Sequence, residues 1–158
     1  LKAKKELIFY TDSDNQFNIN DLGKLLPLLS KYDIVSGYRT IRKDPLTRII
    51  TAFVYNLLVR TLFDLSIKDV DASFKLYKRK VFQKINLKSD TGLIDAEVLI
   101  KARKNGFLIG QVGVRHYPRT YGKTIYEIGG SHNTLAIVRP SVVLEIFKEI
   151  KKLWKELR

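Results

Sequence analysis

The chain has 158 residues, no cysteine and a formal net charge of +13. A hydrophobic fraction of 45% is typical of a globular domain with a core and excludes a disordered chain. The lack of cysteine excludes disulfides and thiolate metal sites, and no apolar run approaches the roughly 18 residues of a membrane span. The excess of lysine and arginine predicts an anionic partner: a phosphorylated substrate, an anionic membrane surface or a nucleic acid.

The predicted elements alternate between strands and helices. Apolar or alternating runs predict strands over 6–11, 33–38, 73–77 and 107–117. Apolar residues at helical spacing predict helices over 19–30, 46–65, 79–85, 91–105, 135–138 and 141–157, with a loop over 118–130. This order predicts an α/β domain with a largely parallel or mixed sheet.

Capping and breaking residues mark several predicted boundaries. Asn18 and Asn20 are candidate N-caps for the second element, and Pro27 is expected to weaken or kink that helix. Gly106 suits the position that ends the helix over 91–105. Pro140 separates the last two predicted helices.

Acidic and amide side chains follow directly on the first predicted strand, at Asp12, Asp14 and Gln16. Ligands of open α/β sheets gather at the carboxyl ends of strands, and Mg²⁺ takes oxygen ligands from carboxylates and substrate phosphates. The pattern therefore suggests a divalent metal site. A polar turn capped by an Asx side chain is the alternative for the same residues.

Positive charge is concentrated in the second half and at the C-terminus. Twelve lysines or arginines but only three acids lie between Lys75 and Lys123. The last predicted helix, 141–157, carries Trp154 on an apolar face bordered by lysines. Such a helix can lie in a membrane interface, or it can pack on the core of its own domain.

Five segments in order carry a resemblance to a known family. They are Asp12-Ser13-Asp14-Asn15-Gln16-Phe17, Val35-Ser36-Gly37-Tyr38-Arg39 with Arg48, Asp69-Val70-Asp71-Ala72-Ser73-Phe74-Lys75, Gly92-Leu93-Ile94-Asp95-Ala96-Glu97 and His116-Tyr117-Pro118-Arg119-Thr120-Tyr121-Gly122-Lys123. Their order and spacing resemble glycosyltransferase family two, in the branch of dolichol- and polyprenyl-phosphate sugar synthases. The resemblance implies a three-layer α/β/α fold called GT-A. It also implies inverting transfer of a sugar from a nucleotide diphosphate sugar, with Mg²⁺ or Mn²⁺.

The resemblance also implies roles for individual residues. Asp12, Asp14 and Gln16 are expected to bind the metal on the donor diphosphate. The side chains expected to bind substrate phosphate are Arg39, Arg48, Arg119 and Lys123, and the first three are expected to converge on the acceptor phosphate. Planar guanidinium groups suit phosphate because they donate paired hydrogen bonds.

Three acids are expected to be catalytic. Asp69 and Asp71 lie before the Ser-Phe-Lys segment, and Asp71 has an alternative role as a turn cap. Asp95 and Glu97 are two apart on a predicted helix and point to different sides. The resemblance favours Glu97 for the pocket, with pairing to a nearby lysine as its alternative.

The chain opens almost directly on the strand that carries the Asp-x-Asp pair. We therefore expect residues 1–130 to be the metal- and acceptor-binding half of the transferase domain, and 131–158 to be a basic amphipathic segment. The nucleotide-binding half is expected to lie elsewhere, so the 158 residues alone should not transfer sugar.

The implied partners are a nucleotide diphosphate sugar and a lipid-linked phosphate, bound at the cytoplasmic face of a membrane. The expected acceptor is a polyprenyl or dolichyl phosphate. Transfer to a glycan hydroxyl, with Asp69 or Glu97 as base, is a second possibility. A non-enzymatic basic module that binds nucleic acid is a third. It explains the charge but leaves the Asp-x-Asp-x-Gln segment without a role.

Overall fold

The computed structural model describes residues 3–41, 46–89, 92–118, 127–128, 137–138 and 140–156. Its main sheet contains β1 (Leu7–Thr11), β2 (Ile34–Arg39), β3 (Phe74–Lys78) and β4 (Ile109–Val114), in the order β1-β3-β2-β4. Strand β3 runs antiparallel to β1 and β2, whereas β4 is parallel to β2. The predicted α/β class with a mixed sheet is confirmed.

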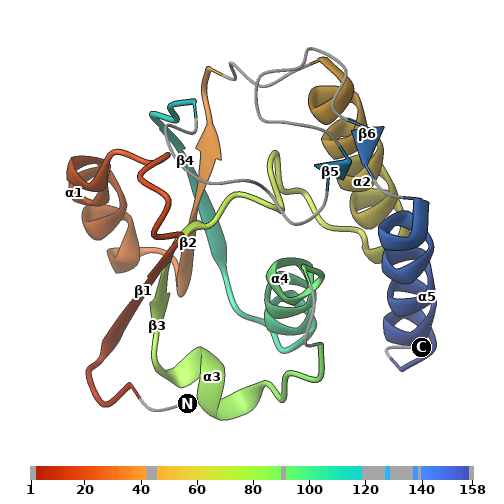
Figure 1. Cartoon of the computed structure of the whole chain (residues 1–158). Helices are drawn as coiled ribbons and strands as arrows, with labels where there is room; N and C mark the ends of the chain where they lie inside the picture. The colour runs from red at the N-terminus through yellow and green to blue at the C-terminus, as the bar shows by residue number, and fades with distance from the viewer. Residues whose placement is uncertain are drawn as a thin grey trace.

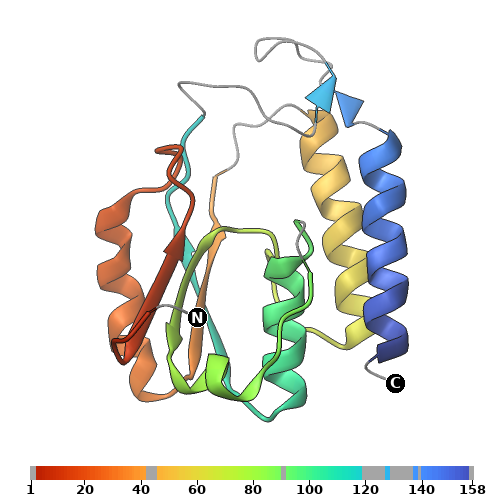
Figure 2. The same ribbon diagram turned by 60° about the horizontal axis from the view of Figure 1, so that its bottom comes forward.

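Helical segments lie on both sides of the sheet (Figure 1). One side carries α1 (Leu22–Leu25) with short 3₁₀ turns at Ile19–Asp21 and Leu26–Ser30. The other side carries α4 (Ile94–Lys104), and α3 (Lys80–Lys84) follows β3 at one end of the sheet. Helices α2 (Leu46–Phe63) and α5 (Pro140–Glu156) run side by side beyond α4 (Figure 2).

Two apolar cores follow from the alternation of side chains along the strands. On the α1 side, Leu25 and Leu29 pack with Val35, Phe74 and Leu76. The core on the α4 side is larger and includes contributions from α2, α4 and α5; among its members are Ile34, Val59, Tyr77, Leu99, Ile150 and Leu153. The fold therefore buries β3 on both faces, although that strand contains a lysine.

Helix α5 packs on the domain through part of its apolar face. Ile150 and Leu153 are only 4% and 5% exposed and join the core. Lys101 of α4 forms an ion pair with Glu156 of α5 at 3.0 Å, and Ser89 donates to Glu149 at 3.1 Å. Intramolecular packing therefore accounts for this side of the C-terminal helix.

The structure departs from two of the predicted helices. Residues 19–30 form a 3₁₀–α–3₁₀ sequence instead of one helix, because Pro27 has no N–H to donate. The predicted helix over 135–138 is wrong where it is described: β6 (Ile137–Val138) pairs with β5 (Glu127–Ile128), which lies within the predicted loop. By contrast, Asn18 caps its segment and Gly106 adopts φ +78° after α4, as expected.

The segment before α1 is joined to the end of β4 by one acid. Asp21 is 1% exposed and accepts hydrogen bonds from the backbone N–H and guanidinium of Arg115, the latter at 2.7 Å through Nη2. These bonds outweigh burial and, with Lys24, lower the pKa of Asp21 well below its usual range. The ionised carboxylate is therefore the form that stabilises the fold.

Replacing Asp21 with asparagine is expected to lower the free energy of unfolding by about 2 kcal/mol at neutral pH, because charge-assisted hydrogen bonds are lost. A depressed native pKa contributes stability above the unfolded pKa of about 3.9 and loses it as the pH falls further. Urea unfolding at a series of pH values checks this. Below about pH 4 the native protein should lose stability more steeply than the variant; equal slopes would contradict the assignment.

Candidate functional site

The predicted metal-ligand segment forms a tight turn after β1. Asp14 Oδ1 accepts from the backbone N–H of Gln16 at 3.1 Å, across Asn15, whose φ is 61°. The side chain of Gln16 is buried and donates through Nε2 to the carbonyl of Tyr117 at 3.1 Å. The segment is thus an Asx turn as well as a candidate ligand set, and the two interpretations of the sequence are compatible.

Carboxylates from several elements gather near this turn. Desolvation, together with repulsion from Asp14 and Asp95, raises the pKa of Asp12 above its usual value, while a hydrogen bond with Ser73 and the charge of Lys75 lower it. These effects on the pKa describe an acidic cluster, formed by Asp12, Asp14, Asp71 and Asp95, in which neighbouring carboxylates destabilise each other's charge. A cation bound there would relieve that repulsion.

The loop between α2 and β3 supplies two further acids. Arg39 donates to both oxygens of Asp69, from Nε at 2.7 Å and Nη2 at 2.8 Å, and both side chains are 10% exposed. Asp71 lies 3.9 Å from the same guanidinium and keeps 49% of its side chain exposed. Desolvation and the charges of Asp95 and Asp69 outweigh Arg39 and raise the pKa of Asp71, and solvent screening at this half-exposed side chain reduces the size of that effect.

Polar side chains from two other elements fix this loop. The buried amide of Asn56 on α2 accepts from Val70 N at 2.7 Å and donates to the carbonyl of Ala52. On β4, Gln111 accepts from Lys68 N at 2.7 Å and donates to Ser66 O at 2.8 Å. Bonds on both sides of Asp69 hold the loop in one arrangement across the end of the sheet.

Sequence reasoning gave no role to Lys75 and favoured Glu97 on α4, whereas the structure places Asp95 beside the acidic cluster. Lys75 is completely buried on β3 and forms an ion pair with Asp95. Asp95, not Glu97, is the α4 acid whose charge acts on Asp12 and Asp71. The sequence did contain a sign of this lysine's role, because Lys75 interrupts the apolar run Phe74-Lys75-Leu76-Tyr77. Buried lysines are rare unless paired, so such a residue indicates a buried ion pair.

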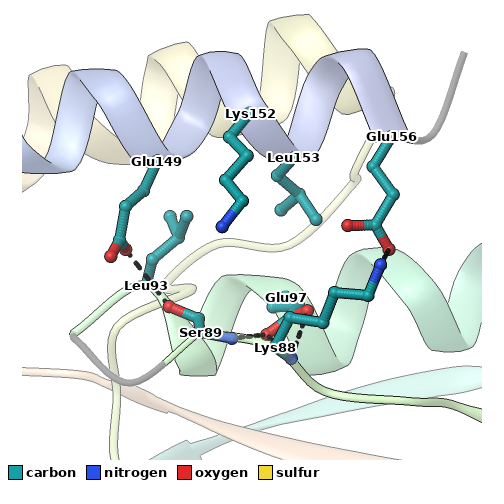
Figure 3. Close-up of a pocket in the computed structure, with 8 residues that line it drawn as sticks. All are labelled: Lys88, Ser89, Leu93, Glu97, Glu149, Lys152, Leu153 and Glu156. Atoms are coloured by element: carbon teal, nitrogen blue, oxygen red, sulfur yellow. Dashed lines mark hydrogen bonds and ion pairs between the residues drawn. The ribbon is translucent and has the colours of Figure 1, made fainter.

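Glu97 faces away from the acidic cluster, contrary to the expectation that it faces the pocket. Its carboxylate accepts from the backbone N–H groups of Lys88 and Ser89 and pairs with Lys101 at 2.6 Å. Figure 3 shows Glu97, Lys88 and Ser89 in a small pocket between α4 and α5, with Glu149, Lys152 and Glu156. The structure thus favours the lysine-pairing alternative, because residues two apart on a helix point to different sides.

The other candidate phosphate-binding residues are Arg48, Arg119 and Lys123. Arg48 is in the first turn of α2, but its side chain lies outside the described residues. Arg119 and Lys123 also lie outside the described residues. The predicted convergence of three arginines on one anion therefore stays a prediction.

The donor set at the end of β1 fits a hard divalent cation. Asp12 and Asp14 offer carboxylate oxygens, and Gln16 uses its nitrogen for Tyr117, so its carbonyl oxygen is the atom that a cation would take. Within the described ranges, no group of three or more His, Cys, Asp or Glu side chains forms a ready metal cage. Two carboxylates that leave positions for phosphate and water suit Mg²⁺ better than a closed site.

Comparison with known proteins gives matches at low identity. The chain is 24% identical to glycosyltransferase AglD of Haloferax volcanii, over 74% of this chain and 20% of that protein. It is 26% identical to polyprenol monophosphomannose synthase of Mycolicibacterium smegmatis (84% and 52%) and 25% identical to the uncharacterized protein MJ1222 of Methanocaldococcus jannaschii (94% and 62%). No family model matches.

The chain thus spans between 20% and 62% of the length of these three relatives. Two of the three are named for glycosyl transfer, and one of those names contains a polyprenol phosphate sugar. The chain is therefore similar to glycosyltransferases, in agreement with the resemblance to family two that its motifs carry.

Proposed function

We propose that this chain is the metal- and acceptor-binding part of an inverting glycosyltransferase that uses a nucleotide diphosphate sugar and a polyprenyl phosphate. The observation that carries the proposal is the acidic cluster at the carboxyl end of β1, bordered by the Arg39–Asp69 pair. The name of the mycobacterial relative supports the lipid phosphate acceptor.

Asp12, Asp14 and Gln16 would hold Mg²⁺ or Mn²⁺ against the donor diphosphate. A bound metal would neutralise the charge that develops on the departing nucleoside diphosphate. In the transfer, an acceptor oxygen attacks the anomeric carbon as the bond from that carbon to the diphosphate oxygen breaks. The electron pair of the broken bond leaves with the nucleoside diphosphate, and the configuration inverts.

The remaining residues of the site would bind and orient the acceptor. Arg39 supplies positive charge at the end of β2 beside Asp71, and Asn56 and Gln111 keep the acidic loop in place. A phosphate acceptor is already an anion and needs little base catalysis. Orientation by a fixed loop is therefore the main contribution expected from this chain to the chemical step.

One observation favours a hydroxyl acceptor as the second candidate. Asp71 keeps 49% of its side chain exposed, so an acceptor hydroxyl can reach it, and the raised pKa of this carboxyl favours a general base. Asp69 and Glu97, the bases first expected, are paired with Arg39 and Lys101. If a sugar hydroxyl is the acceptor, Asp71 is the better candidate base.

The exposed faces of α2 and α5 support a membrane-surface location. Ile50, Phe53, Val54 and Leu57 share one face of α2 and are each at least 46% exposed. Phe147 of α5 is 48% exposed, and several lysines follow it along that helix. Among the described helices, none has the length and apolarity to span a bilayer. Apolar side chains beside lysines suit the interface of an anionic bilayer.

Replacing Phe53, Leu57 and Phe147 together with serine is expected to weaken vesicle binding by about tenfold or more, because apolar area no longer enters the bilayer. Flotation of the full-length protein with phosphatidylcholine vesicles, with and without phosphatidylglycerol, measures this. Leu108→Ser is the matched control, since Leu108 is 58% exposed just before β4. Equal binding by the triple variant and the control would argue against this surface.

The function itself is tested by incubating the full-length protein with labelled UDP- and GDP-sugars and a polyprenyl phosphate. Metal-dependent label in the lipid fraction, abolished by EDTA, is the expected result. Label in a soluble glycan acceptor would favour the hydroxyl alternative. Binding to nucleic acid that ignores the metal and weakens steeply with salt would favour the non-enzymatic interpretation.

A further inference from the structure

Lys75 stands out among the charged residues because it has no exposure to solvent. It lies on β3, between β1 and β2, opposite Tyr10 on one neighbour and Ser36 on the other. The next row of the same sheet face is apolar, with Ile8, Tyr77 and Ile34. An apolar residue would therefore suit this position by packing alone.

A buried ammonium is costly even when it is paired, and apolar replacements of buried pairs are often neutral or stabilising. A contribution to the stability of the fold therefore does not explain the Lys75–Asp95 pair. Its place in the fold offers another explanation. Asp95 is in the first turn of α4, and Lys75 spans the gap between that helix and the sheet.

Besides Asp95, the ammonium of Lys75 donates to one backbone group, the carbonyl of Ala72, at 2.6 Å. Ala72 lies between Asp71 and Ser73, and the Ser73 hydroxyl lowers the pKa of both Asp12 and Tyr10. Lys75 therefore fixes the backbone from which Asp71 projects, together with the residue whose hydroxyl lowers the pKa of Asp12. Helix α4 is connected through this lysine to both sides of the acidic cluster.

We propose that Lys75, held by Asp95, is a positioning residue that fixes the 71–73 segment so that Asp12 and Asp71 are presented to the metal and the substrate. The proposal rests on the proposed function, because it assumes that a divalent cation binds at Asp12. The pair acts through Ala72 and Ser73 and touches neither the metal nor the substrate. Partners of this kind change metal affinity or activity by about 10- to 100-fold when they are removed.

The test uses the full-length protein and the double variant Lys75→Met/Asp95→Leu, which removes both buried charges together. Mn²⁺ binding is titrated by electron paramagnetic resonance with UDP and then GDP present, and thermal unfolding is recorded in parallel. We expect a folded variant whose Mn²⁺ affinity falls by about 10- to 100-fold. Lys78→Met, at the other end of β3, is the matched control and should bind Mn²⁺ like the native protein.

A folded double variant with native Mn²⁺ affinity would overturn the positioning role and leave the proposed function intact. The same loss of affinity in Lys78→Met would also overturn it. A native protein that binds no Mn²⁺ with either nucleotide would overturn both proposals. If the double variant does not fold, Lys75→Gln/Asp95→Asn keeps a polar contact across the gap, and the same affinity criterion applies to it.

Discussion

Replacing Asp14 with asparagine is expected to reduce sugar transfer by the full-length protein by about a thousandfold. A thousandfold loss corresponds to about 4 kcal/mol of transition-state stabilisation, the range expected when a charged metal ligand is removed. Asparagine keeps an oxygen that can accept from Gln16 N, the hydrogen bond that closes the turn after β1. The fold should therefore survive, and metal-dependent donor binding should be lost.

Transfer assays and calorimetric titration of the donor with Mn²⁺ measure this effect, and thermal unfolding confirms that the variant is folded. Asp14→Ala provides the comparison, because it removes both the charge and the turn hydrogen bond. It should lose at least as much activity as Asp14→Asn and also some stability. Native activity in a folded Asp14→Asn variant would remove Asp14 from the metal site.

Replacing Arg39 with alanine is expected to lower the free energy of unfolding by about 3–5 kcal/mol, because it leaves the largely buried carboxylate of Asp69 without its bidentate partner. Such a loss is a large share of the stability of a typical domain. Denaturant unfolding of the full-length protein, followed by fluorescence of Trp154, gives the value.

The double variant Arg39→Met/Asp69→Leu is the matched control for this pair. It should recover most of the stability, since apolar residues can replace a buried pair with little loss. The double variant still lacks the guanidinium of Arg39. If Arg39 also binds acceptor phosphate, the KM of this variant for polyprenyl phosphate should therefore be higher than that of the native protein. Native KM in the stable double variant would restrict Arg39 to a structural role.

Several local features of the fold were predictable because they depend on short-range patterns. Apolar or alternating runs located all four strands of the main sheet, and Gly106 ended α4 as predicted. The segment over 19–30 is broken into 3₁₀ and α turns, in agreement with the expectation that Pro27 weakens a helix there. The β5–β6 pair was missed because two-residue strands are too short to show a period.

The sequence by itself determined the α/β class, the order of the elements and the position of Asp12, Asp14 and Gln16 at a strand end. These properties follow from residue types and periods along the chain. Only the tertiary structure decided which acids share the site. Asp95 joins the cluster through Lys75, and Glu97 pairs with Lys101 on another side of α4. The direction of each carboxylate depends on how α4 is rotated against the sheet, and packing of the whole core sets that rotation.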